Sequence, residues 1–170
     1  MAATVDLLEC NSAGQTTTSA ISNINFGSTD AANLVYTSFP ITVGTNSYDK
    51  YIKVRVSAWD VSNKIDNLQI WKSAGNYVAG ERIVTNLTAS GYSSVSYATP
   101  ALTSYSGTLM PTAAPGTANL GVGASGLTGY MSGSVTTSDF WRMQLQTNVG
   151  GTTPVGNANQ KTFTIQYDEQ

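Results

Sequence analysis

Residues 48–71, YDKYIKVRVSAWDVSNKIDNLQIW, decide the fold. Up to Trp59 the apolar and polar positions alternate. One face carries Ile52, Val54, Val56 and Ala58, and the other carries Tyr51, Lys53, Arg55, Ser57 and Trp59. A period of two is typical of a β-strand with one face buried. The first half of this stretch therefore predicts a strand of the core.

The second half of the stretch predicts another strand. Residues 60–63 are typical of a turn, and Ile65, Leu68 and Ile70 then resume the apolar series. The shift from an odd to an even position indicates a β-bulge near Asp66 and Asn67. We expect the two strands to form a hairpin at the centre of a sheet.

Composition extends this expectation to the whole chain. Only 11% of the 170 residues are charged, against roughly 25% in an average protein. Thr, Ser, Asn and Gly together make up 71 residues. Thr favours strands, whereas Gly, Asn and Ser favour turns, so the chain has the composition of an all-β protein with many loops.

Further strands are predicted along the chain on both sides of this stretch. They are expected at residues 4–10, 21–26, 33–43, 82–88, 92–99, 140–148 and 161–167, with weaker ones at 118–122 and 129–135. Pro40 makes the 33–43 strand an edge strand or bends it, because proline cannot donate to a ladder. No window shows the 3.6-residue period of a helix.

These patterns predict one domain over residues 1–170, a two-sheet antiparallel β-sandwich of jelly-roll or immunoglobulin-like kind with about 9–10 strands. Residues 1–16 are expected to form an N-terminal arm. Residues 100–133 are expected to form a long excursion, because they hold seven glycines together with Pro111 and Pro115.

Several function classes receive no support from the residues. The net charge is −2 and no basic stripe is present, which disfavours direct binding of nucleic acid. The chain lacks His, which removes the commonest general base and metal ligand. Neither a catalytic site nor a cofactor or metal is expected. The single cysteine, Cys10, is predicted to be a small buried hydrophobe of the first strand.

Two motifs are weak on inspection. Residues 121–126, GVGASG, have the GxGxxG spacing, but the next residues do not predict the helix that a phosphate-binding loop requires. Asp60 and Asp66 flank a turn and could share a calcium ion, although turn-forming aspartates explain them more simply.

The start of the chain, MAATVDLLECNSAG, does not resemble a signal peptide, because no basic region precedes an unbroken apolar run. No window is apolar enough for a membrane span. A virion protein, made in the host cytoplasm, would combine this start with a surface of small neutral residues. A piece of a secreted protein is the alternative.

Taken together, the strand series, the start of the chain and the neutral surface resemble the β-sandwich head decoration, or cement, proteins of tailed phages. The resemblance implies a structural protein on the capsid surface, with the major capsid protein as partner and a homo-oligomer on the particle. The segments NKIDNLQIWKSAG (63–75) and TFTIQYDE (162–169) are also similar to strands of jelly-roll sugar-binding modules. A glycan- or receptor-binding module of an attachment protein is therefore the alternative.

Each hypothesis names contact residues. For the decoration protein we expect partner contacts in the arm, in the excursion and on the basic outer face of the central strand. These residues are Val5, Leu7, Leu8, Lys53, Arg55, Tyr105, Leu109, Met110, Leu120 and Val122. For the alternative, Trp59 is the candidate for stacking on a sugar ring.

Overall fold

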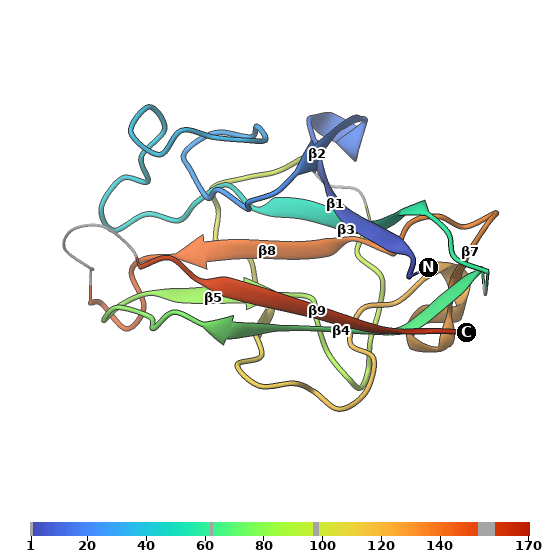
Figure 1. Cartoon of the computed structure of the whole chain (residues 1–170). Coiled ribbons are helices and arrows are strands. Elements are labelled where there is room, and N and C mark those ends of the chain that lie inside the picture. The colour runs from blue at the N-terminus through green and yellow to red at the C-terminus, as the bar shows by residue number, and fades with distance from the viewer. Residues whose placement is uncertain (1, 62, 97–98, 153–158) are drawn as a thin grey trace.

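The computed structural model describes residues 2–61, 63–96, 99–152 and 159–170. Two antiparallel sheets face each other (Figure 1), which confirms the predicted two-sheet β-sandwich. The larger sheet has the strand order β2-β1-β3-β8-β5-β6. Its members along the chain are β1 (Thr4–Asn11), β2 (Thr17–Ile21), β3 (Lys50–Ala58), β5 (Arg82–Thr85), β6 (Thr108–Leu109) and β8 (Trp141–Gln146).

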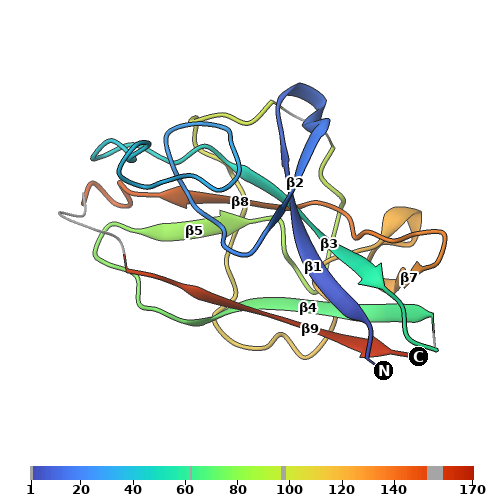
Figure 2. The same cartoon turned by 45° about the horizontal axis from the view of Figure 1, so that its top comes forward.

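The smaller sheet has the order β7-β4-β9. It is formed by β4 (Lys64–Ala74), β7 (Met131–Ser132) and β9 (Thr162–Glu169). Two short 3₁₀ helices, η1 (Ala13–Gln15) and η2 (Gly123–Thr128), lie in the connections. Figure 2 gives a second view of β9 beside β4.

The core lies between the two sheets and follows the predicted alternation. From β3 it takes Ile52, Val54 and Val56, and these side chains are at most 4% exposed. Strand β8 contributes Trp141, Met143 and Leu145 in the same way. Since every second residue of each strand points inward, the period of two in the sequence has become one continuous core.

The two central strands do not form the expected hairpin. β3 belongs to the larger sheet and β4 to the smaller one, so the chain crosses from one layer to the other between Trp59 and Asn63. Their apolar faces meet across the core instead of lying side by side. Both strands carry a strongly apolar face, and facing layers bury both sets of side chains.

The predicted β-bulge in the second strand is confirmed. The pairing of β4 with β9 shifts register between Asp66 and Gln69, and Asn67 has a φ of 51°. A bulge leaves one residue out of the ladder and so restores the inward direction of the following side chains. Both Ile65 and Leu68 are consequently buried.

The prediction of an N-terminal arm is wrong over residues 4–11. These residues form β1, an interior strand that pairs with β2 on one side and β3 on the other. Val5 and Leu7 face the core, and Asp6 pairs with Arg55 of β3. Deleting this strand would divide the larger sheet, so it cannot be a detachable contact arm.

The glycine-rich excursion exists, but it is packed into the fold. Met110, Leu120 and Val122 lie in the core. Asn119 lies beside the edge of β4. Its side chain accepts from the Ile70 N–H and donates to the Ile70 carbonyl, each at 2.8 Å. These contacts close the part of β4 that lies beyond β7.

Four predicted strands do not form where they were expected. The second strand spans 17–21 rather than 21–26. Residues 33–43 and the described part of 92–99 contain no strand, while residues 97–98 lie outside the described residues. Residues 118–122 are irregular as well, and only Met131 and Ser132 of 129–135 are in a strand. Without a neighbour to pair with, strand propensity alone does not produce a strand.

Candidate functional site

An open groove lies between the two sheets, on the side where β9 ends the smaller sheet. Its volume is about 710 Å³. Its inner wall is formed by Trp141, Leu145 and Ile83 of the larger sheet, and Phe163 and Ile165 of β9 border it. The outer wall comes from the connection between β2 and β3, namely Ile24, Phe26, Tyr36, Phe39, Pro40, Ile41 and Val43. We call this cavity the open groove.

The open groove carries no free charge. Among the residues that line it, only Glu81 and Lys161 are charged, and they bind each other at 2.5 Å with almost no exposure. Trp141 is fully buried, and its indole N–H has no hydrogen-bond partner in the described part of the chain. The Trp141 and Phe163 rings meet edge to face at 5.4 Å between their centroids. An apolar, uncharged group therefore fits this surface best.

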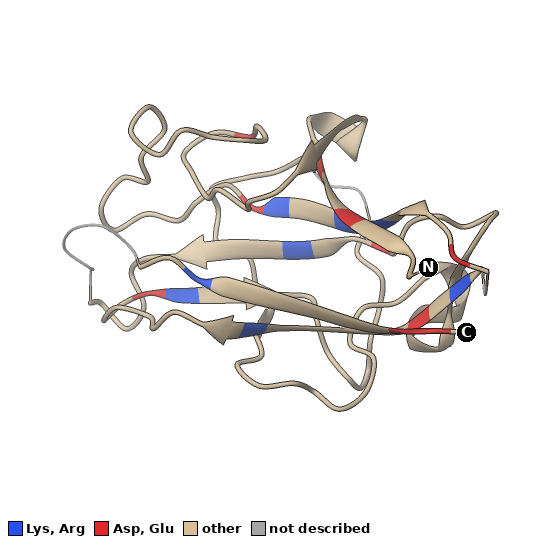
Figure 3. Cartoon of the chain, viewed as in Figure 1, with Lys and Arg blue, Asp and Glu red and all other residues tan. Residues whose placement is uncertain are grey.

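The outer wall continues into an exposed apolar surface. Residues 34–43, LVYTSFPITV, are named the apolar segment. Val35 is 57% exposed, Tyr36 73% and Val43 72%, and all of residues 35–40 are exposed. No charged residue occurs from position 31 to position 48, and in Figure 3 this part of the chain is accordingly tan.

Both ends of the apolar segment are anchored. On one side, Lys50 Nζ donates to the Ala31 carbonyl at 2.8 Å and binds Glu9 at 2.6 Å, with both charged side chains fully buried. On the other side, the Ser47 N–H donates to the Leu145 carbonyl at 2.9 Å. Between these anchors the backbone forms local turns, such as that from the Ser38 N–H to the Val35 carbonyl, and the Phe39 carbonyl accepts from the Ser28 N–H. The segment is thus held in place while most of its side chains, though not Leu34, stay accessible.

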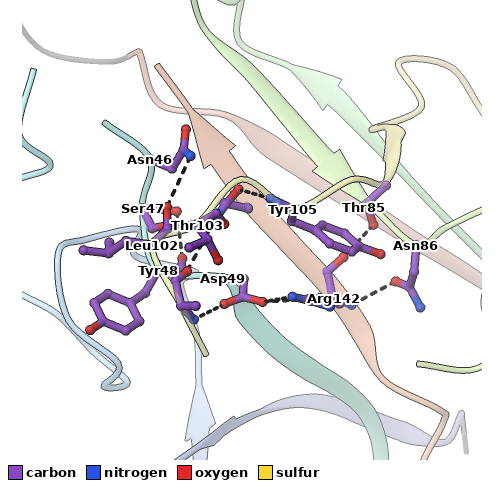
Figure 4. A network of polar contacts seen from close by, with 12 residues as sticks. Asn46, Ser47, Tyr48, Asp49, Thr85, Asn86, Leu102, Thr103, Tyr105 and Arg142 are labelled. Carbon is purple, nitrogen blue, oxygen red and sulfur yellow. Dashed lines mark hydrogen bonds and ion pairs between the residues drawn. The ribbon is translucent and has the colours of Figure 1, made fainter. Parts of the chain in front are cut away.

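A polar network lies on the face of the larger sheet that points away from the open groove. Asp49, which is 1% exposed, binds Arg142 at 2.5 Å and accepts from the Ala101 N–H at 2.6 Å (Figure 4). The Arg142 guanidinium lies 4.0 Å from the centre of the Tyr105 ring. Gln144 adds hydrogen bonds to the Ser47 and Thr103 carbonyls. Charge-assisted bonds of this kind fix the start of the excursion on the outer face of the sheet.

Three of the predicted contact residues are placed in the core. Met110, Leu120 and Val122 are at most 5% exposed. As partner contacts these three predictions are wrong, because the excursion turns its apolar side chains inward to complete the sandwich. Leu109, by contrast, is 64% exposed.

The other predicted contact residues are scattered over different surfaces. Val5 and Leu7 are partly buried against the core, and Leu8 lies on the opposite face of β1. Lys53 covers the Phe140 ring at 4.5 Å, and Tyr105 packs on Arg142.

Arg55 binds Asp6 through two hydrogen bonds of 2.6 and 2.8 Å, and the Arg55 guanidinium holds the pKa of Asp6 below its usual value. The structure therefore does not gather the predicted residues into one site.

The structure also places Trp59 and Cys10, for which the sequence made separate predictions. Trp59, the candidate for sugar stacking, is partly buried and packs against the core, so its role in stacking stays a prediction. Cys10 is a free, buried thiol, which confirms its prediction as a buried residue of the first strand. Burial raises the pKa of the Cys10 thiol and so disfavours the reactive thiolate.

The weak motifs have structural partners. The Gly123 N–H of the GVGASG stretch donates to Asp139 at 2.8 Å, so a carboxylate occupies the place of an anion there. Asp66 binds Lys64 at 2.7 Å. Within the described ranges, no three His, Cys, Asp or Glu side chains gather as a metal site, and no helix has the length and hydropathy of a membrane span.

Comparison with known proteins gives no match: no family model, no curated protein and no solved structure corresponds to the chain. The function must therefore be inferred from the site itself.

Sequence reasoning missed the site's main residues, Val35, Tyr36, Phe39 and Val43. A pattern that could have revealed these residues was present in the sequence. An uncharged stretch alternates Val35, Thr37, Phe39, Ile41 and Val43 with more polar residues. We interpreted that alternation as a strand of the sandwich. In the structure the same residues form an exposed loop beside an open groove.

Proposed function

We propose that the protein is a structural subunit of a virus particle, a decoration protein that binds the outer capsid surface and stabilises the shell. The observation that carries the proposal is the open groove together with the exposed apolar segment beside it. Large contiguous apolar patches on a protein surface usually mark an interaction site. The resemblance in strand pattern and composition to head decoration proteins gives the class of assembly.

The chemistry of the surface supports a protein partner. The groove lining and the apolar segment offer aromatic and aliphatic side chains, and the one charged pair in the groove is internally neutralised. The centre of a stable protein–protein interface has this composition, with charged residues confined to its rim. The major capsid protein is the proposed partner, and several copies of the chain are expected to cluster on the particle.

The proposal can be tested with purified particles and the isolated protein. We expect the chain to co-sediment with capsids at a fixed copy number relative to the shell subunit, and to raise the temperature at which the shell opens. The double substitution Val35→Asp and Val43→Asp should weaken binding about tenfold or more, because it places charge on the apolar segment.

Val61→Asp is the matched control. Val61 is 90% exposed but does not line the open groove, so this variant should bind like the unmodified protein. Absence of the chain from purified particles, together with no binding to capsids in solution, would contradict the proposed function.

A further inference from the structure

The starting observation is the unprotected edge of the smaller sheet. Among the described residues, β9 pairs only with β4, which leaves the backbone groups of its other edge without a strand partner. It is eight residues long, whereas the edge strands β6 and β7 have two residues each and β2 has five. Free edges are normally shortened, charged or covered, since they can pair with another chain.

The sequence of β9 has charged residues only at its end, at Asp168 and Glu169. From Thr162 to Tyr167, TFTIQY, it contains no Pro and no charged residue. Its inward side chains Phe163, Ile165 and Tyr167 are only partly buried, although they pack against the core. A strand of this kind is typical of the interior of a sheet, so the smaller sheet has the character of a sheet that lacks one strand.

The opposite edge of the smaller sheet, formed by β4, is covered by other parts of the chain, in contrast to the edge of β9. β7 pairs with the first two residues of β4, Lys64 and Ile65, and the excursion continues from there. Asn119 binds both main-chain groups of Ile70, and the Pro111 carbonyl accepts from the Lys72 N–H at 2.8 Å. The described residues provide no such cover for β9.

The apolar segment has the pattern of the missing strand. Its odd positions from 35 to 43 are Val, Thr, Phe, Ile and Val, which are residues with high strand propensity. Among the described residues, its backbone makes local turn bonds within residues 35–39, the Thr42 carbonyl accepts from Thr45, and the Phe39 carbonyl accepts from the Ser28 N–H. Pro40 is acceptable in an added strand, because that strand would itself be an edge.

The segment of the same molecule is not free to fill the groove. Its residues Tyr36, Phe39 and Ile41 already form the outer wall, and its two ends are anchored through Ala31 and Ser47. A strand added to β9 beside this wall would therefore come from another molecule, whose own segment opens its local turns to become extended. A second copy brings an uncharged segment to an uncharged groove, so no charge is buried without a partner.

We propose that residues 34–43 of a second copy add to the free edge of β9 as an extended strand, with alternate apolar side chains in the open groove. The main-chain hydrogen bonds of the added strand supply affinity, and the groove supplies the fit for alternate side chains. The inference rests on the proposed function in taking this surface as an assembly surface, and it names a second copy as the partner.

Self-association of the purified chain tests the proposal. Analytical ultracentrifugation should show a reversible dimer or larger oligomer at micromolar concentration, and hydrogen exchange of residues 34–43 and 162–167 should slow together as concentration rises. Val35→Asp with Val43→Asp should raise the Kd about tenfold or more. Ile165→Lys on β9 should do the same, and Val61→Asp should have no effect.

Mixing supplies the decisive control. For mixing, the segment variant is Val35→Asp with Thr37→Asp, because neither residue lines the open groove and its groove therefore stays unchanged. The Ile165→Lys variant retains a normal segment, so the mixture should restore association where each variant alone fails. Circular dichroism and thermal melting confirm that each variant is folded. If Ile165→Lys does not fold, Thr162→Lys replaces it, because Thr162 is exposed at the rim of the groove.

Three results would overturn the inference: a wild-type chain that stays monomeric at high micromolar concentration, association that the segment variant leaves unchanged, or a mixture that fails to associate. A monomer that still binds capsids, or an extended shell peptide, through the segment would overturn the second-copy inference while the proposed function stands. Association through β9 in a protein that never binds particles would overturn the proposed function alone.

Discussion

Residues 100–133 and residues 31–48 are both largely irregular and uncharged, yet the fold treats them in opposite ways. The first segment buries Met110, Leu120 and Val122, and Asn119 completes the hydrogen bonds of β4. The second leaves Val35, Tyr36 and Val43 in solvent beside an open groove. Irregular backbone is therefore no guide to function here, whereas unburied apolar surface and an unpaired strand edge are.

The largest expected effect on the free energy of unfolding comes from truncating one apolar side chain to alanine in each segment and comparing the two variants. Leu120→Ala should lower the free energy of unfolding by about 2–5 kcal/mol, because it leaves a cavity in the core. Val35→Ala should change it by less than about 0.5 kcal/mol, since Val35 is exposed. Urea denaturation at a concentration where the protein is monomeric measures both. Similar losses for the two variants would break the comparison.

A smaller loss is expected at Asn119. Asn119→Ala removes the acceptor for the Ile70 N–H and the donor to its carbonyl, and leaves both groups buried without partners. The expected loss is about 2–3 kcal/mol by denaturant unfolding. Thr117→Ala is the matched control, because Thr117 is an exposed neighbour in the same excursion. If Asn119→Ala is no less stable than this control, the excursion does not close β4 in the way described.

The smallest effect is expected outside both segments, at the ion pair of Asp6 and Arg55. The pair lowers the pKa of Asp6 below 3.8, so its stabilisation is present above that value and is lost as pH falls through the lowered pKa. Asp6→Asn should therefore lower the urea midpoint slightly at neutral pH. The difference from the unmodified protein should shrink as pH falls below about 5 and through the lowered pKa of Asp6.

The size of this pH effect has a clear limit. Both side chains are about one-third exposed, so solvent screens their attraction. A difference that does not shrink as pH falls would show that the substitution acts through packing rather than through charge. Lys53→Ala, on the same face of β3, is a control that should show no such pH dependence in the acid range.

A feature could be predicted from the sequence when it depends on residues close together in the chain, and could not when it depends on the pairing of distant strands. The bulge at Asp66–Asn67 was predictable because it follows from the spacing of Ile65 and Leu68 within a single strand. The groove was not, since it requires knowing that β9 is an edge strand and that residues 33–43 remain unpaired. The same alternation of Val35, Phe39 and Val43 fits an inner strand and an exposed segment equally well.

By itself the sequence determined an all-β chain, most of its longer strands and which face of each is apolar, because these properties depend on neighbours one or two residues apart. Only the tertiary structure decided that β3 and β4 lie in opposite sheets and that residues 4–11 are an interior strand. It also decided that the excursion fills the core while the apolar segment stays exposed. These outcomes depend on which distant strands pair, and strand pairing is set by burial of the whole set of apolar faces rather than by any local pattern.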